Sequence, residues 1–287
     1  MISSGWQLTI YCVLVLIASL AGGSLLLIIQ PTHRRLQIAI SFVAGLMLGI
    51  ALLHFLPDAV EQLQSANPAN PVDRTVAWML GGFLSMFFLQ RFFHFHHHDS
   101  PEGDPEDCDH GHAMEHDEHE HHAHTLAEKS AQHLSWVGTV LGLTLHSLLD
   151  GLALAAAVEA GAQGNVRWAG LGVALVVILH KPFDAMAVST LMTASGSSRA
   201  SRHLLNTLFA LVSPIGAVLF YFGASQLANS SAAVLGCALA FCAGTFLCIA
   251  SSDLLPELQF HSHDRFKLSF ALLAGLAVAI IIKQFEA

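Results

Sequence analysis

The chain has 287 residues, of which 54% are hydrophobic and only 11% are charged. Soluble domains usually carry about a quarter of charged residues, so this composition excludes an ordinary soluble protein and indicates an integral membrane protein. The formal net charge of −9 reflects one segment, because eleven of the 21 acidic residues lie between positions 94 and 133; the near-neutral remainder argues against a nucleic-acid partner.

Eight runs are long and apolar enough to cross a bilayer as helices, which takes about 20 residues each. In chain order they cover residues 6–29, 38–61, 76–93, 136–159, 168–192, 204–227, 232–255 and 267–284. This pattern predicts an all-α membrane protein. Three spans lie in residues 1–93 and five in residues 134–287.

The basic residues predict the orientation of these spans. If both termini lie outside the cytoplasm, eight lysines and arginines fall in cytoplasmic connections and three in outer ones. Cytoplasmic loops carry such an excess. We therefore expect a protein of the plasma (inner) membrane with both termini outside.

Residues 94–133 form a connection of unusual composition. It holds 12 of the 19 histidines, in runs such as HFHHHD and HEHHAH, and almost no apolar residues. Such a segment cannot bury a core, so we expect a disordered cytoplasmic loop that binds metal weakly. The alternative is a solvated acidic linker without a role in metal binding.

Spans four and five each contain a histidine followed four residues later by an aspartate: His146 and Asp150 in HSLLDG, and His180 and Asp184 in HKPFDA. This spacing places both members of a pair on one helix face. The short connection makes the two spans antiparallel neighbours, with all four side chains within ~6 Å of the midplane. Imidazole and carboxylate suit zinc, so we predict a metal site; the alternative is a structural hydrogen bond between helices.

Other polar residues lie toward the ends of two spans. His54 and Asp58 in HFLPDA, at the outer end of span two, are candidates for an entrance or gate. A candidate exit lies at the inner end of span seven: Asp253, Glu257, His261 and His263. The alternative for both groups is polar helix ends in water.

Lys181 and Pro182 directly follow His180. A protonated lysine cannot ligate a metal, so Lys181 either pairs with a carboxylate such as Asp58 or occupies the place of a second cation. Pro182 removes a helical hydrogen bond and predicts a locally opened helix at the site, with a simple kink as the alternative.

The ends of spans two and seven, HFLPDA and SDLLPEL, are similar and point in opposite directions. These spans are the middle members of the first and last three. The similarity suggests an inverted repeat of three spans flanking spans four and five.

With these motifs, the chain resembles the Zrt/Irt-like (ZIP) family of metal transporters over nearly its full length. HSLLDG and HKPFDA are the most specific elements, and HFLPDA and SSDLLPE add to them. The resemblance implies uptake of a divalent ion into the cytoplasm by alternating access. Zinc is the expected substrate, with iron, manganese, cadmium and cobalt as alternatives. It also implies that His146, Asp150, His180 and Asp184 are the ligands, and that spans one, four, five and six move as a unit.

Three residues depart from the two-metal members of that family. Ser147, Lys181 and Ser213 stand where those members carry Asn, Asp and Glu. All three changes remove ligands of a second ion, and Lys181 adds positive charge. We therefore predict a site for a single metal.

Two other functions fit intramembrane histidines and aspartates. A metal-dependent hydrolase would use its ion to activate water, but the chain has no H-E-x-x-H motif and no evident general base, so we predict that it is not an enzyme. A metal sensor would bind without transport. The expected partners are the ion and the bilayer; a homodimer is compatible with the small residues in several spans, which identify no subunit interface.

Overall fold

The computed structural model describes residues 4–29, 33–66, 69–93, 118–164, 166–194, 196–226, 231–251 and 265–286. These residues form helices and no strand. Eight helical stretches among them are long and apolar enough to cross a membrane, which confirms the all-α, eight-span prediction.

The helices follow the predicted spans closely. Their bounds are α1 Ser4–Ile29, α2 His33–Ile50, the π-helix η1 Ala51–Phe55, α3 Leu56–Ala66, α4 Pro71–Phe93, α5 Glu118–Gln163, α6 Leu171–Ala194, α7 Arg199–Gln226, α8 Ser231–Ile249 and α10 Arg265–Glu286. α2, η1 and α3 follow one another without a break and together form span two. Helices prevail because a bilayer offers no partners for backbone N–H and C=O groups.

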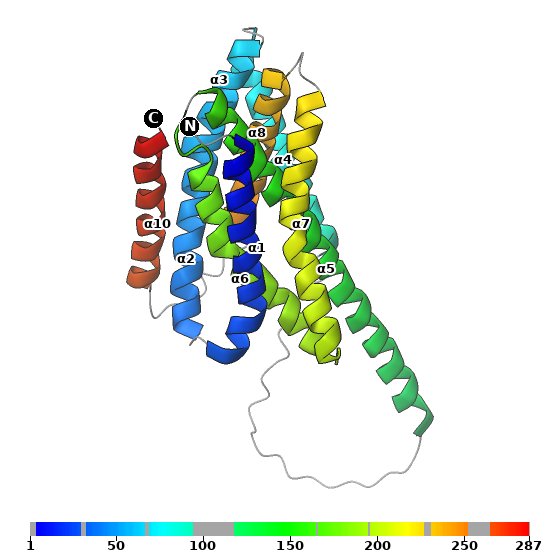
Figure 1. The fold of residues 1–287 in the computed structure, drawn as a ribbon. Coiled ribbons are helices and arrows are strands. Elements are labelled where there is room, and N and C mark those ends of the chain that lie inside the picture. Colours follow the sequence, from blue (N-terminus) through cyan, green and yellow to red (C-terminus); the bar gives the residue numbers. More distant parts are fainter. Residues whose placement is uncertain are drawn as a thin grey trace.

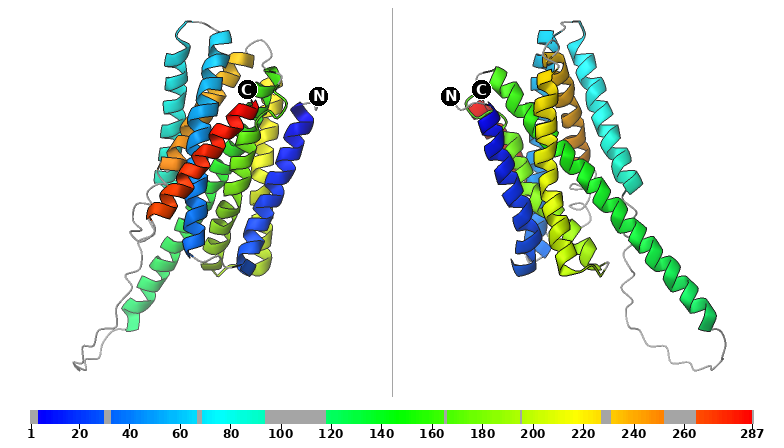
Figure 2. Two further views of the ribbon diagram at one scale, coloured as in Figure 1. Left: turned by 90° about the vertical axis from the view of Figure 1, so that its left-hand side faces the viewer. Right: turned by 45° about the vertical axis from the view of Figure 1, so that its right-hand side comes forward.

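The helices run roughly antiparallel in one bundle, and both ends of the chain lie at the same end of it (Figure 1). α5 projects beyond the bundle at the opposite end (Figure 2). The closest packing occurs within two groups, one of α1, α5, α6 and α7 and the other of α2, α3, α4, α8 and α10. The first group corresponds to the four-helix unit that the family resemblance implies.

Close approach of α5 and α7 depends on two glycines. A Cβ atom on Gly151 would overlap the carbonyl oxygen of Ser213, and one on Gly216 would overlap that of Leu148. The two backbones therefore touch directly beside Asp150, and this contact brings Ser213 to the predicted metal site.

Only residues 118–133 of the predicted loop 94–133 belong to the described residues. Glu118 to His133 are helical and continue into span four as the first part of α5; the disorder of the connection stays a prediction. Nine of these 16 residues are Ala, Glu, Leu, Lys or Gln, which favour helix, and five are histidines. The stretch also extends a helix already formed in the membrane. Residues 94–117 lie outside the described residues.

Among the described residues, π-helical turns lie in span two, at Ala51–Phe55, and at the end of span seven, at Ala250 and Ser251, and not at Pro182. α6 is α-helical across Pro182, so the predicted opening there is wrong. In span two, the N–H of Leu56 bonds to Ala51 O, the longer-range bond of a π-turn. Pro57 follows directly and has no N–H to donate, so the π-turn lets the helix continue into α3.

Candidate metal centre

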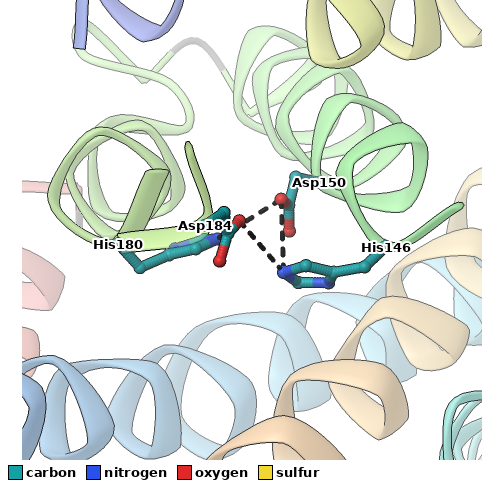
Figure 3. Close-up of side chains that lie close together, drawn as sticks. All are labelled: His146, Asp150, His180 and Asp184. Atoms are coloured by element: carbon teal, nitrogen blue, oxygen red, sulfur yellow. Dashed lines mark hydrogen bonds and ion pairs between the residues drawn. The ribbon is translucent and has the colours of Figure 1, made fainter. Parts of the chain in front are cut away.

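The four predicted ligands lie together in the middle of the bundle. His146 and Asp150 come from α5, and His180 and Asp184 come from α6. Figure 3 shows their side chains pointing toward a common centre between the two helices. One ligand atom from each residue can be chosen so that all four lie within 4.8 Å of one another.

The individual distances suit a tetrahedral ion. His146 Nε2 lies 3.6 Å from Oδ2 of both Asp150 and Asp184, and His180 Nε2 lies 3.3 and 3.8 Å from the same two oxygens. Four bonds of 2.0–2.1 Å in tetrahedral directions would place ligands about 3.3 Å apart. These four distances are within about 0.5 Å of that value, and the widest separation in the cluster, 4.8 Å, would have to close by about 1.5 Å around a bound ion.

The environment of the ligands also fits a cation. Asp150 is fully buried and its Oδ1 has no hydrogen-bond partner; Asp184 Oδ2 is likewise buried without one. Such oxygens are costly unless a partner satisfies them. His180 Nδ1 lies 2.9 Å from Val176 O, and donation to this carbonyl leaves the Nε2 lone pair for a metal.

Lys181 is part of this cluster. Its side chain is fully buried, and Nζ donates to Asp150 Oδ2 at 2.9 Å and lies 3.6 Å from Asp184 Oδ2. The suggested pairing with Asp58 is therefore wrong. With Lys181 included, two carboxylates and one ammonium leave a single net negative charge, which a divalent ion would turn into a single positive one.

The three positions that depart from the two-metal pattern are brought together. Lys181 Nζ donates to Ser147 Oγ at 2.7 Å, and Ser213 Oγ donates to the backbone oxygen of Ser147 at 2.8 Å. Nζ also lies 5.3 Å from the ring centroid of Phe209, within cation–π range. The ammonium is thus held on one side of the cluster by a hydroxyl, a carboxylate and an aromatic face.

The site opens toward one end of the bundle. A cavity of about 410 Å³ is lined by His146, His180 and Asp184, and by residues nearer the projecting end of α5, among them Gln90 and Thr139. The cavity thus extends from the cluster toward the end of the bundle from which α5 projects.

A second cavity, of about 520 Å³, lies at the end with the chain termini. We call it the outer vestibule; His54, Asp58, Glu61 and Lys283 are among its lining residues, and none of the four ligands is. Asp58 Oδ1 accepts a hydrogen bond from Lys283 Nζ at 2.9 Å, and His54 Nε2 lies 2.9 Å from Ala279 O. Both contacts join span two to α10.

Sequence reasoning missed two residues of these sites. In the sequence, Lys283 contributes only to the charge count that predicts the orientation, and nothing distinguishes Phe209 from the other apolar residues of span six. Neither has a local signal, because their partners Asp58 and Lys181 lie far away in the chain. The predicted exit residues Asp253, Glu257, His261 and His263 lie outside the described residues.

These features define the class: a membrane protein with eight candidate spans in its described residues and a cluster of two histidines and two aspartates between two antiparallel spans. A model of the ZIP zinc transporter family matches residues 7–283, and the chain belongs to this family. Since the family consists of zinc transporters and not enzymes, the hydrolase alternative is set aside.

Several zinc transporters are similar to the chain. Zinc transporter ZIP9 of Xenopus tropicalis is 35% identical over 151 residues, which cover 50% of this chain and 48% of the relative. Zinc transporter SLC39A7 of Rattus norvegicus is 27% identical over 318 residues, covering 90% of this chain and 67% of the relative. The chain spans about half the length of the ZIP9 relatives that it matches.

Proposed function

We propose that this protein carries divalent metal ions, zinc foremost, across the plasma (inner) membrane into the cytoplasm through a single intramembrane site. The observation that carries the proposal is the convergence of two imidazoles and two carboxylates within 4.8 Å in a bundle of eight spans. The relatives' description as zinc transporters supports zinc as the cargo.

The direction follows from the orientation of the spans. Both termini lie outside, and the His-rich connection lies in the cytoplasm with most of the basic residues. The cavity that reaches the site then faces inward, and the outer vestibule is the other half of an alternating-access cycle. The ion leaves toward the predicted exit at Asp253 and Glu257 and the His-rich connection.

Reconstitution into liposomes tests this function. Purified protein in vesicles that contain a zinc-sensitive dye should give saturable dye signal when zinc is added outside, and empty vesicles should not. Zinc binding without flux would indicate a sensor and contradict transport. Competition by iron, manganese, cadmium and cobalt in the same assay would rank the cations.

A single ion per site is proposed because Lys181 Nζ already neutralises one side of the cluster. Lys181→Asp should raise the zinc bound per chain from one ion to two, since it replaces an ammonium by a ligand beside Ser147. Metal analysis after equilibrium dialysis measures this. Lys181→Met, which removes the charge without adding a ligand, is the matched control and should still bind one ion; unchanged stoichiometry in Lys181→Asp would contradict the role of Lys181.

The outer vestibule is proposed as the entrance, with Asp58 attracting the cation and Lys283 opposing it. Asp58→Asn should raise KM for uptake roughly 2–5-fold with little change in kcat, the effect of one partly exposed charge. Lys283→Met should lower KM. Asp73→Asn, an exposed carboxylate at the start of α4 and outside the vestibule, is the control; equal effects of the two Asp variants would argue against this entrance.

A further inference from the structure

A third cavity lies away from the metal centre, at the end of the bundle from which α5 projects. It has a volume of about 440 Å³ and lies between α1, α6 and α7. Arg199, Arg202, His203 and Asn206 of α7 line it, together with Thr193 of α6. The transport proposal assigns no role to this cavity.

The cavity is positive, and none of its described lining residues is acidic. α1 and α7 contain no acidic residue, and the single acid of α6, Asp184, is nine residues before Thr193, about 13 Å along the helix. Neither Arg199 nor Arg202 forms an ion pair with a carboxylate of the described residues. Two guanidinium groups at one mouth therefore have no carboxylate partner in the part of the chain that the structure describes.

One guanidinium is already oriented. Arg202 Nη1 donates to Thr193 Oγ1 at 2.7 Å, which ties the first turn of α7 to the end of α6 and leaves the rest of the donor fork for a ligand. Ser198 Oγ accepts a hydrogen bond from the N–H of Ser201 at 3.2 Å and caps the helix. The positive end of the α7 dipole adds to the attraction for an anion.

Asn206 is the independent sign of a ligand. Its side chain is only 6% exposed, yet it lines the cavity and its Oδ1 has no hydrogen-bond partner. A Cβ atom on Gly23 of α1 would overlap this amide, so the glycine makes room for it. A buried acceptor without a donor is costly. A phosphate group that keeps one proton would donate its O–H to this Oδ1 and accept hydrogen bonds from the arginines through its other oxygens.

We infer that this cavity binds a phosphate group through Arg199, Arg202 and Asn206. Arginine forks match phosphate oxygens well. The cavity lies where lipid-facing surface begins, since Leu204 and Leu208 on the same helix are 63% and 52% exposed. The phosphate is therefore that of an anionic phospholipid or a free phosphate ion. All three lining helices belong to the unit that holds the metal site, so the bound group would stabilise that unit.

The test uses the full-length protein in detergent and does not depend on transport. Its Tm is measured with increasing dioctanoyl phosphatidic acid, dioctanoyl phosphatidylcholine or inorganic phosphate. For wild type, Tm should rise with phosphatidic acid and not with phosphatidylcholine. If inorganic phosphate also raises Tm, the cavity accepts any phosphate group. If only phosphatidic acid raises Tm, the ligand is the anionic lipid.

Variants connect the response to the cavity. In Arg199→Gln/Arg202→Gln, the anion concentration needed for half the rise should increase at least about ten-fold. Arg35→Gln/Arg265→Gln removes two exposed charges at the same end of the bundle and should respond like wild type. Asn206→Asp places a carboxylate beside the arginines and should abolish the response. This single variant still tests the inference where the double variant does not fold. A wild type without any response, or an Asn206→Asp protein that responds normally, would overturn the inference.

Discussion

Replacement of His146 or Asp184 by alanine is expected to abolish saturable zinc uptake while the protein still folds. Each residue supplies one of four converging ligand atoms. Even loss of a group that only supports a ligand costs 10–100-fold in metal affinity, so loss of a ligand should cost more than about 100-fold. Uptake into dye-loaded liposomes and zinc binding by equilibrium dialysis measure the effect.

Glu159→Ala is the matched control for these variants. Glu159 lies on α5 like Asp150, is partly buried and lies outside the cluster, so its removal should leave uptake close to wild type. Asp184→Glu keeps a carboxylate and should retain measurable uptake. Normal uptake by His146→Ala or Asp184→Ala would show that the ions pass elsewhere.

Asp150→Ala is expected to do more than remove a ligand, because it leaves the buried ammonium of Lys181 without its closest carboxylate. Breaking a buried ion pair from one side typically costs about 3–5 kcal/mol. For a protein of this size, that corresponds to a fall in Tm of roughly 10 °C. Thermal unfolding in detergent without added metal would show it.

Two comparisons separate this effect from loss of the metal. Asp184→Ala should lower Tm less, because Asp184 Oδ2 lies 3.6 Å from Lys181 Nζ and Asp150 Oδ2 lies 2.9 Å away. Asp150→Ala/Lys181→Met should recover most of the lost stability and still fail to transport. If Asp150→Ala unfolds at the wild-type temperature, the pair does not stabilise the fold.

Much of the architecture could be predicted because its signals are local. Apolar runs locate the spans, since each must fill the bilayer thickness with satisfied backbone. The four-residue spacing of His146 and Asp150 puts both on one helix face, and α6 repeats the pattern with His180 and Asp184. The short connection between the two helices then makes the convergence of these four side chains predictable without coordinates. The family followed from the same residues.

Partners across the bundle could not be predicted in this way. From the sequence, Lys181 could pair with any of several carboxylates. The rotation and depth of α6 relative to α5 select Asp150 as its closest partner. Lys283 meets Asp58 across 225 positions of sequence, and no periodicity encodes that pairing. The π-turn before Pro57 and the helix at Glu118–His133 could not be predicted either. In both places the local composition does not decide which backbone hydrogen bonds form.

The sequence alone therefore determined the number of spans, the clustering of His146, Asp150, His180 and Asp184, and the family, because hydropathy and helical spacing act within one segment. The tertiary structure decided how the charges combine: the ammonium of Lys181 beside the metal ligands, the ion pair in the outer vestibule and the arginine-lined cavity. These arise from helices packed side by side, whose relative rotation and height set every distance between side chains.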